Sequence, residues 1–131
     1  MIDLSPRSFI VRIVGEISGE EYAGTFKAKP LLSHAEQIQV DALIRDFLGP
    51  RPAEATNRAK NQAALLAETA VRLIEPTPSW WKDSRGGADL IDDSLLREVY
   101  NGALKVESDF KAEIQERAKA AKEEISKLDV K

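Results

Sequence analysis

The chain contains no cysteine, and this absence excludes disulfide bonds, thiolate nucleophiles and metal sites built on cysteine. It contains a single histidine, His34, which has no second histidine or cysteine with which to build a transition-metal site. No nucleophile-elbow motif is present, so His34 is also a poor candidate for a Ser-His-Asp triad. We therefore interpret His34 as an exposed residue at the start of a helix.

Long apolar runs and an excess of basic residues are also missing. No run is long enough to cross a bilayer, and the first residues lack the basic head and apolar stretch of a secretory signal. The formal net charge is −3, which gives no electrostatic reason to expect nucleic acid as a partner. With 131 residues, 43% of them hydrophobic, the chain is expected to form a single domain. We also expect a cytoplasmic protein that binds neither membranes nor nucleic acids.

Residues 8–32 are predicted to form a β-hairpin that turns at residues 18–21. Every residue from Phe9 to Val14 except Arg12 is aromatic or β-branched, and such residues recur in the second strand, at Tyr22 and Phe26. The first strand is apolar on both faces apart from Arg12, which indicates that another element covers it or another chain pairs with it. Because a lone hairpin is marginally stable, it must pack on helices or extend a larger sheet.

A capping box opens the first of three predicted helices. Ser33 and Glu36 have the spacing at which a hydroxyl and a carboxylate satisfy reciprocal backbone donors, and Gly49 follows the last apolar residue. The first helix is therefore predicted over residues 33–48. An alanine-rich apolar stripe predicts the second helix over residues 55–75.

The third predicted helix is the longest. Its apolar residues recur every three or four positions, but the stripe thins to alanine beyond Ile114, so the helix is expected to leave the body and lie against a partner or a second copy. Three stabilising ion pairs are expected along it: Glu107 with Lys111, Glu113 with Arg117, and Glu123 with Lys127. The predicted fold is thus α+β and mostly α, in one domain made of a hairpin (1–32), a helical core (33–78), a loop (79–91) and a long C-terminal helix (92–131).

Both tryptophans of the chain, Trp80 and Trp81, stand side by side in the predicted loop. The segment is flanked by proline and contains Gly86-Gly87, so neither a helix nor a strand is expected there. Two interpretations stay open at this point. One or both indoles complete the core, or one is exposed and binds a partner.

The carboxylates of this segment could suggest a calcium site. Residues 83–93 contain four aspartates but lack the EF-hand spacing, and we expect Asp92 or Asp93 to cap the following helix. The glycine pair lacks the Gly-Lys-Ser/Thr ending of a phosphate-binding loop. The sequence therefore predicts no catalytic residue, no metal and no cofactor.

Residues 79–84 (SWWKDS) and 87–92 (GADLID) follow an alanine-rich helix and a small N-terminal β element. In this order, over residues 24–103, the features resemble those of a tail assembly chaperone of a tailed bacteriophage. The resemblance implies a non-enzymatic protein that acts in the host cytoplasm. It would coat the tape-measure protein, keep it soluble and allow the tail-tube protein to polymerise around it.

On this interpretation, apolar side chains in the tryptophan segment and along the last helix contact the partner. The predicted partner-binding residues are Trp80, Trp81, Leu90, Ile91, Phe110, Ile114, Ile125 and Leu128. The edge of the hairpin is expected to support self-association into a homo-oligomer. Two alternatives remain: a small structural or adaptor protein that stays in the virion, and an enzyme of unknown class.

Overall fold

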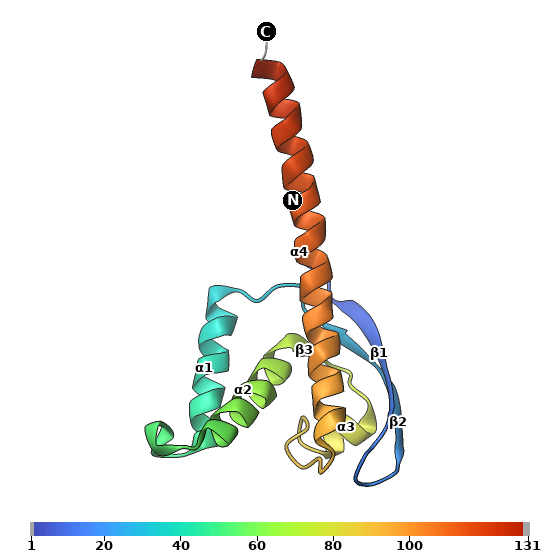
Figure 1. The fold of residues 1–131 in the computed structure, drawn as a ribbon, viewed down its shortest axis with the longest axis vertical. Coiled ribbons are helices and arrows are strands. Elements are labelled where there is room, and N and C mark those ends of the chain that lie inside the picture. The colour runs from blue at the N-terminus through green and yellow to red at the C-terminus, as the bar shows by residue number, and fades with distance from the viewer. Residues whose placement is uncertain (1, 130–131) are drawn as a thin grey trace.

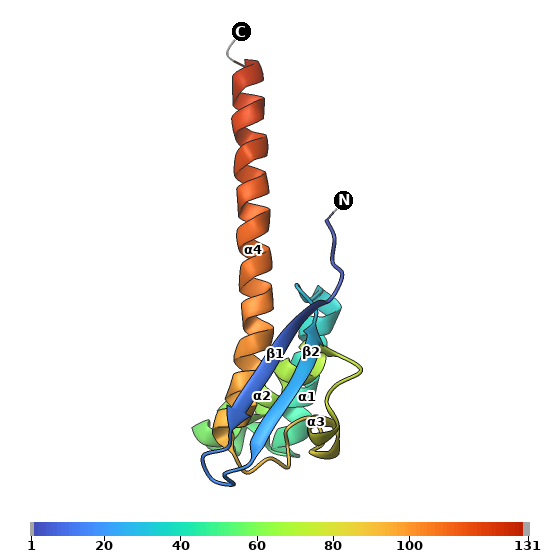
Figure 2. The same cartoon turned by 90° about the vertical axis from the view of Figure 1, so that its right-hand side faces the viewer.

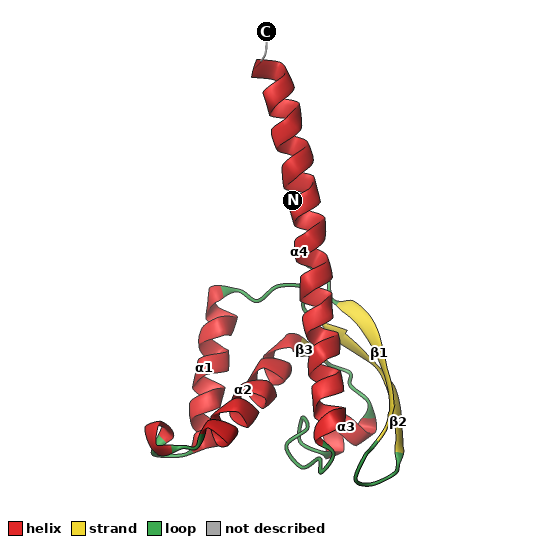
Figure 3. Ribbon diagram, in the orientation of Figure 1, coloured by secondary structure: helices red, strands yellow, loops and turns green. Residues whose placement is uncertain are grey.

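The computed structural model describes residues 2–129, and its elements follow the predicted order of a hairpin and then helices (Figure 1). The fold is α+β and mostly α, as Figure 3 shows. A short third strand joins the hairpin in an antiparallel sheet of order β1-β2-β3. The elements are β1 (Arg7–Val14), β2 (Glu21–Ala28), α1 (His34–Leu48), the 3-10 turn η1 (Pro52–Glu54), α2 (Asn57–Arg72), β3 (Leu73–Ile74), α3 (Ser79–Asp83) and α4 (Asp93–Asp129).

The sheet has one covered face and one open face. Phe9 and Phe26 lie opposite each other on the covered face, and their rings stack with centroids 5.4 Å apart. Figure 2 shows this hairpin lying across the first half of α4. The other face exposes Ile10 and Val14. Within residues 2–129, therefore, no element provides the second cover that the apolar pattern of β1 indicates.

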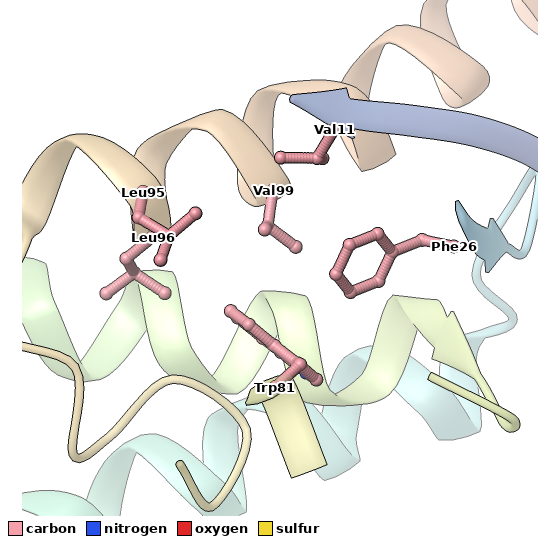
Figure 4. Packing of buried hydrophobic residues seen from close by; sticks show 6 residues of the cluster. All are labelled: Val11, Phe26, Trp81, Leu95, Leu96 and Val99. Atoms are coloured by element: carbon pink, nitrogen blue, oxygen red, sulfur yellow. The ribbon is translucent and has the colours of Figure 1, made fainter. Parts of the chain in front are cut away.

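The main core lies between the covered face of the sheet, α3 and the first turns of α4 (Figure 4). Trp81 is only 4% exposed and stands edge-on to Phe26, with ring centroids 5.7 Å apart. Of the two interpretations of the tryptophans, the structure places Trp81 in the core. The buried members of this cluster are Val11, Phe26, Trp81, Leu95, Leu96 and Val99.

The prediction of a loop over residues 79–91 is wrong at its start, because α3 contains both tryptophans. The Pro78 carbonyl accepts hydrogen bonds from the backbone N–H groups of Trp81 and Lys82, at 3.0 and 3.1 Å, and so closes one helical turn. Neighbours in a helix point about 100° apart, so the two indoles diverge. Trp81 enters the core, whereas the half-buried Trp80 donates its Nε1–H to the Ala23 carbonyl at 3.0 Å.

The second helix is shorter than predicted, because its expected last residues form β3 instead. Leu73 has an extended backbone, with φ −77° and ψ 146°, and pairs with Ala28 of β2. Ile74 is β-branched, and Pro76 disfavours helix in the residue before it, so both favour the change to a strand. The predicted helix over residues 55–75 is therefore α2 followed by the two residues of β3.

The boundaries of α1 agree with the predicted helix over residues 33–48, with Ser33 as its N-cap. The Glu36 N–H donates to the Ser33 hydroxyl at 3.2 Å, and the Ser33 N–H donates to the Glu36 carboxylate at 3.0 Å. Gly49 ends the helix with a φ of 83°. The helix packs on α2 through Val40, and its first residue, His34, is exposed as expected. This pair of helices lies beside α4, away from the hairpin (Figure 1).

Helix α4 supports the sheet with its first half and projects from the body with its second half (Figures 1 and 2). Val99, Ala103 and Val106 are buried on one stripe, whereas residues 115–128 are exposed on every side of the helix. The prediction that the last helix extends from the body is thus confirmed. Its predicted last residues, 130 and 131, lie outside the described residues.

Ion pairs lie at the point where α4 leaves the body. The expected pair of Glu107 and Lys111 is present, with 3.1 Å between the charged atoms. Glu113, however, binds the guanidinium of Arg7 through hydrogen bonds of 3.0 and 2.5 Å, in place of the expected Arg117. The difference arises because the start of β1 lies beside this turn of α4, where Arg7 also covers the ring of Phe110.

We expect Trp81→Ala to lower the free energy of unfolding by about 3–5 kcal/mol, because it removes a large buried ring and leaves a cavity. Trp80→Phe should lower it by only about 1 kcal/mol, because it keeps an aromatic ring and loses one hydrogen bond. Urea unfolding followed by far-UV circular dichroism measures both changes. Equal losses in the two variants would contradict the different positions of the two indoles.

Candidate functional site

A groove of about 830 Å³ lies between α2, the loop that follows α3 and the start of α4. One wall is a stripe of α2 with the spacing i, i+3, i+4, i+7, which begins at Arg58 and ends at Leu65. The opposite wall is the loop of residues 87–91. The groove is lined by Ile17, Arg58, Asn61, Gln62, Leu65, Leu66, Gly87, Ala88, Leu90, Ile91, Asp92, Asp93, Leu96 and Arg97.

The groove combines an apolar floor with a polar rim. Leu65, Leu66 and Leu90 are half-buried and reach the main core, so their inner sides are fixed while their outer sides face the groove. Ile91 is 65% exposed beside them. Arginine and amide side chains of α2 and α4 form the rim. A concave apolar surface with a few polar groups at its border suits a peptide segment or an amphipathic helix.

The structure brings two of the eight predicted partner-binding residues, Leu90 and Ile91, into this groove. Trp81 lies behind the groove, where it packs so closely on Gly87 that an added Cβ would meet its ring. Its role is therefore to support the loop. Trp80 lies at the edge of β2 beside Tyr22, with ring centroids 5.2 Å apart, and does not line the groove.

The other four predicted residues lie along α4, at a distance from the groove. Phe110 is buried under Arg7 and is a core residue, and Ile114 is half-buried where the helix leaves the body. Ile125 and Leu128 are exposed on the projecting half. The exposed members of the predicted set thus lie in two separate places: Leu90 and Ile91 in the groove, and Ile125 and Leu128 on the projecting half of α4.

The contribution of α2 to the groove is the part that the sequence patterns did not predict. The apolar stripe identified in this helix is rich in alanine; its Ala67 and Val71 pack on α1, whereas its Leu66 lines the groove. Leu65 lies outside that stripe. A leucine outside the stripe that faces the core indicates a second apolar surface, so Leu65 could have predicted this wall of the groove. Arg58 lies three residues before Asn61 and four before Gln62, and all three line the groove. Nothing in the sequence around Arg58 indicated this position.

Asp92 fixes one end of the groove by joining the hairpin turn to α4. Its carboxylate accepts hydrogen bonds from the Ser18 hydroxyl at 2.7 Å and from the backbone N–H groups of Ile17 and Ser18 at 2.6 and 3.3 Å. The Asp92 backbone carbonyl accepts from the first turn of α4. Asp92 thus occupies the expected capping position of the helix, but its side chain caps the hairpin turn.

The surroundings of Asp92 favour its charged form. The hydrogen bonds from the Ser18 hydroxyl and from the Ile17 N–H hold the pKa of Asp92 below its ordinary value, against the opposing effect of burial. The side chain is 1% exposed, and Gly15 allows it to approach the turn. A Cβ added at Gly15 would lie 2.7 Å from Cγ of Asp92.

The remaining aspartates near the loop are engaged in ion pairs or are exposed. Asp89 accepts two hydrogen bonds of 2.8 Å from Arg85, and Asp93 accepts one of 2.7 Å from Arg97. Within residues 2–129, no group of three His, Asp or Glu side chains is arranged to hold a metal ion. Asp89 and Asp93 are thus each paired with an arginine four residues away.

A second, polar cavity of about 380 Å³ lies between α1, α2 and α4. The largely buried Arg72 binds Glu68 at 2.9 Å and also binds Glu107, which in turn binds Lys111. Burial alone would raise the pKa of Glu107, but hydrogen bonds from the two basic side chains lower it. Two positive charges balance two negative charges, so this cluster is an ion-pair network that joins α2 to α4.

Comparisons of the chain with protein-family models, curated proteins and solved structures give no match. Among the helices of residues 2–129, none combines the length and the apolar character needed to span a membrane. Function is therefore inferred from the residues of this chain.

We expect Asp92 to make the stability of the fold sensitive to acid. Its folded-state pKa is lowered from 3.8, so its contribution is complete above that value and disappears as the pH falls through the folded-state pKa. Asp92→Asn should lower the Tm at neutral pH and flatten its fall between about pH 5 and about pH 2.

Differential scanning calorimetry across this range measures the effect. The matched control is Asp83→Asn, which makes the same change at an exposed position of α3. Identical Tm profiles in the two variants would show that the contact between Asp92 and the hairpin turn contributes nothing.

Proposed function

We propose that this protein is a non-enzymatic tail assembly chaperone of a tailed bacteriophage that binds the tape-measure protein. The single observation that carries the proposal is the groove, which has an apolar floor, a polar rim and the exposed Ile91 at its border. The stretch that best resembles such chaperones, residues 79–92, forms α3 and the loop wall of the same groove. Sequence resemblance and groove thus coincide in one part of the molecule.

The chemistry of the groove is that of helix recognition. A tape-measure protein is expected to present long amphipathic helices before the tail tube surrounds it. An apolar stripe of such a helix fits over Leu65, Leu66 and Leu90, while Asn61 and Gln62 can satisfy polar groups at its border. Because the groove is open, the bound helix can leave when tube subunits replace the chaperone.

The same residues do not favour an enzyme. Asp92 is committed to the hairpin turn and the exposed Asp93 pairs with Arg97, so the groove lining offers no second free carboxylate beside Asp93. A catalytic acid and base need free access to a substrate proton. The proposed activity is therefore non-enzymatic, and no cofactor is part of the proposal. The proposed setting is the host cytoplasm during assembly, with the tail-tube protein as the proposed second partner.

We expect Ile91→Asp to weaken tape-measure binding by roughly tenfold or more, because it places a charge against the apolar stripe of the bound helix. The matched control is Ile38→Asp, since Ile38 is 67% exposed on α1, outside the groove. Isothermal titration calorimetry with helical segments of the tape-measure protein encoded in the same genome gives both affinities. If the two variants bind equally well, the groove is not the site.

A small virion protein is the second candidate, because the exposed edge of β1 and the projecting half of α4 also suit permanent assembly. Mass spectrometry of purified particles separates the two functions. A chaperone is expected to be present in infected cells and absent from mature particles. Stoichiometric amounts in the particle would favour the structural or adaptor protein.

A further inference from the structure

The projecting half of α4 carries a heptad pattern that neither the body nor the groove uses. Its apolar residues recur at alternating intervals of four and three, which is the average period of 3.5 of a two-stranded coiled coil. Residues 115–128 are exposed on every side of the helix, so no element within the described residues buries this stripe. The seam consists of Ile114, Ala118, Ala121, Ile125 and Leu128.

We propose that two copies of this chain pair through this seam as an antiparallel coiled coil. The seam residues then meet in layers, with Ala118 of one copy against Ala121 of the other and Ile114 against Ile125. Small residues at the centre allow the helices to approach closely, and isoleucines close the contact on both sides. The proposal is independent of the function proposed for the groove.

The flanking charges select the antiparallel orientation. Arg117 and Glu124 each precede a seam residue by one position, and in an antiparallel pair such positions face one another across the contact. Arg117 of each copy therefore meets Glu124 of the other, and the symmetry gives two attractive contacts. In the same arrangement Lys122 faces the neutral Gln115.

A parallel pair in register would place like charges together instead. Arg117 of each copy would then face Lys122 of the other copy, again twice. Two repulsive contacts would replace two attractive ones, so the sequence disfavours this orientation.

The antiparallel pair also places Leu128 beside Lys111 of the other copy, where that helix enters its body. The two bodies thus lie at opposite ends of the paired segment.

Charge reversal tests both the association and its orientation. In sedimentation velocity across a dilution series, the full chain is expected to form a reversible dimer, and Arg117→Glu should weaken it roughly tenfold. Glu124→Arg should have the same effect, and a mixture of the two variants should restore the affinity. The matched control is Glu116→Arg, which makes the same charge change on the outer face and should leave the dimer intact.

The opposite results overturn the proposal. A parallel dimer would be strengthened by Arg117→Glu, because that change converts repulsion from Lys122 into attraction. A chain that stays monomeric at every concentration would show that the seam does not pair with a second copy. Binding of a tape-measure helix by that monomer, lost in Ile125→Asp, would assign the seam to the other partner.

Spin-label distances give a second, independent readout. Because the chain has no cysteine, Lys119→Cys and Ser126→Cys each create a unique labelling site on the same side of the helix. In the antiparallel pair, labels at 119 lie close together, whereas labels at 126 are offset by about 20 Å along the axis. Equal distances at the two sites would contradict the antiparallel arrangement.

Discussion

The hydrogen bonds between the Asp92 carboxylate and the hairpin turn are the constraint on which the rest of the structure depends. They join residues 74 and 75 positions apart in the chain, and they do so where α4 begins. With the turn tied to this point, the covered face of the hairpin lies along α4, and Phe26 and Trp81 are enclosed between them. The same contact places Ile17 at the end of the groove, so core and candidate site share one anchor.

Close approach between backbone and side chains makes this arrangement possible at two further places. Phe9 packs on Gly102 of α4, and Pro78 packs on Gly24 of β2, where any Cβ would collide with the ring. Sheet, α3 and α4 can therefore lie in contact without a layer of larger side chains between them. Because interiors tolerate little overpacking, a Cβ at either glycine would force these elements apart.

Local signals explain which elements could be predicted from sequence. The capping box at Ser33 and Glu36 acts within four residues, and α1 begins and ends accordingly. Long-range contacts explain the failures: Leu73 pairs with Ala28 of β2, far away in the sequence, and no pattern near Asp92 indicates Ser18 as its partner. The groove requires α2 and the loop to face each other, which is a property of tertiary packing. Sequence could identify Leu90 and Ile91, but not the opposite wall.

Pairing through the seam of α4 would also join two grooves in one dimer. A dimer joined through residues 111–128 would carry its two bodies at opposite ends of a paired segment about 27 Å long, and hence two grooves on one particle. If a single partner chain reached both grooves, it would be held at two points. The second contact is then intramolecular, and weak binding at each groove gives strong retention overall. Separation of the dimer would lower that retention without altering either groove, which provides a physical route for release.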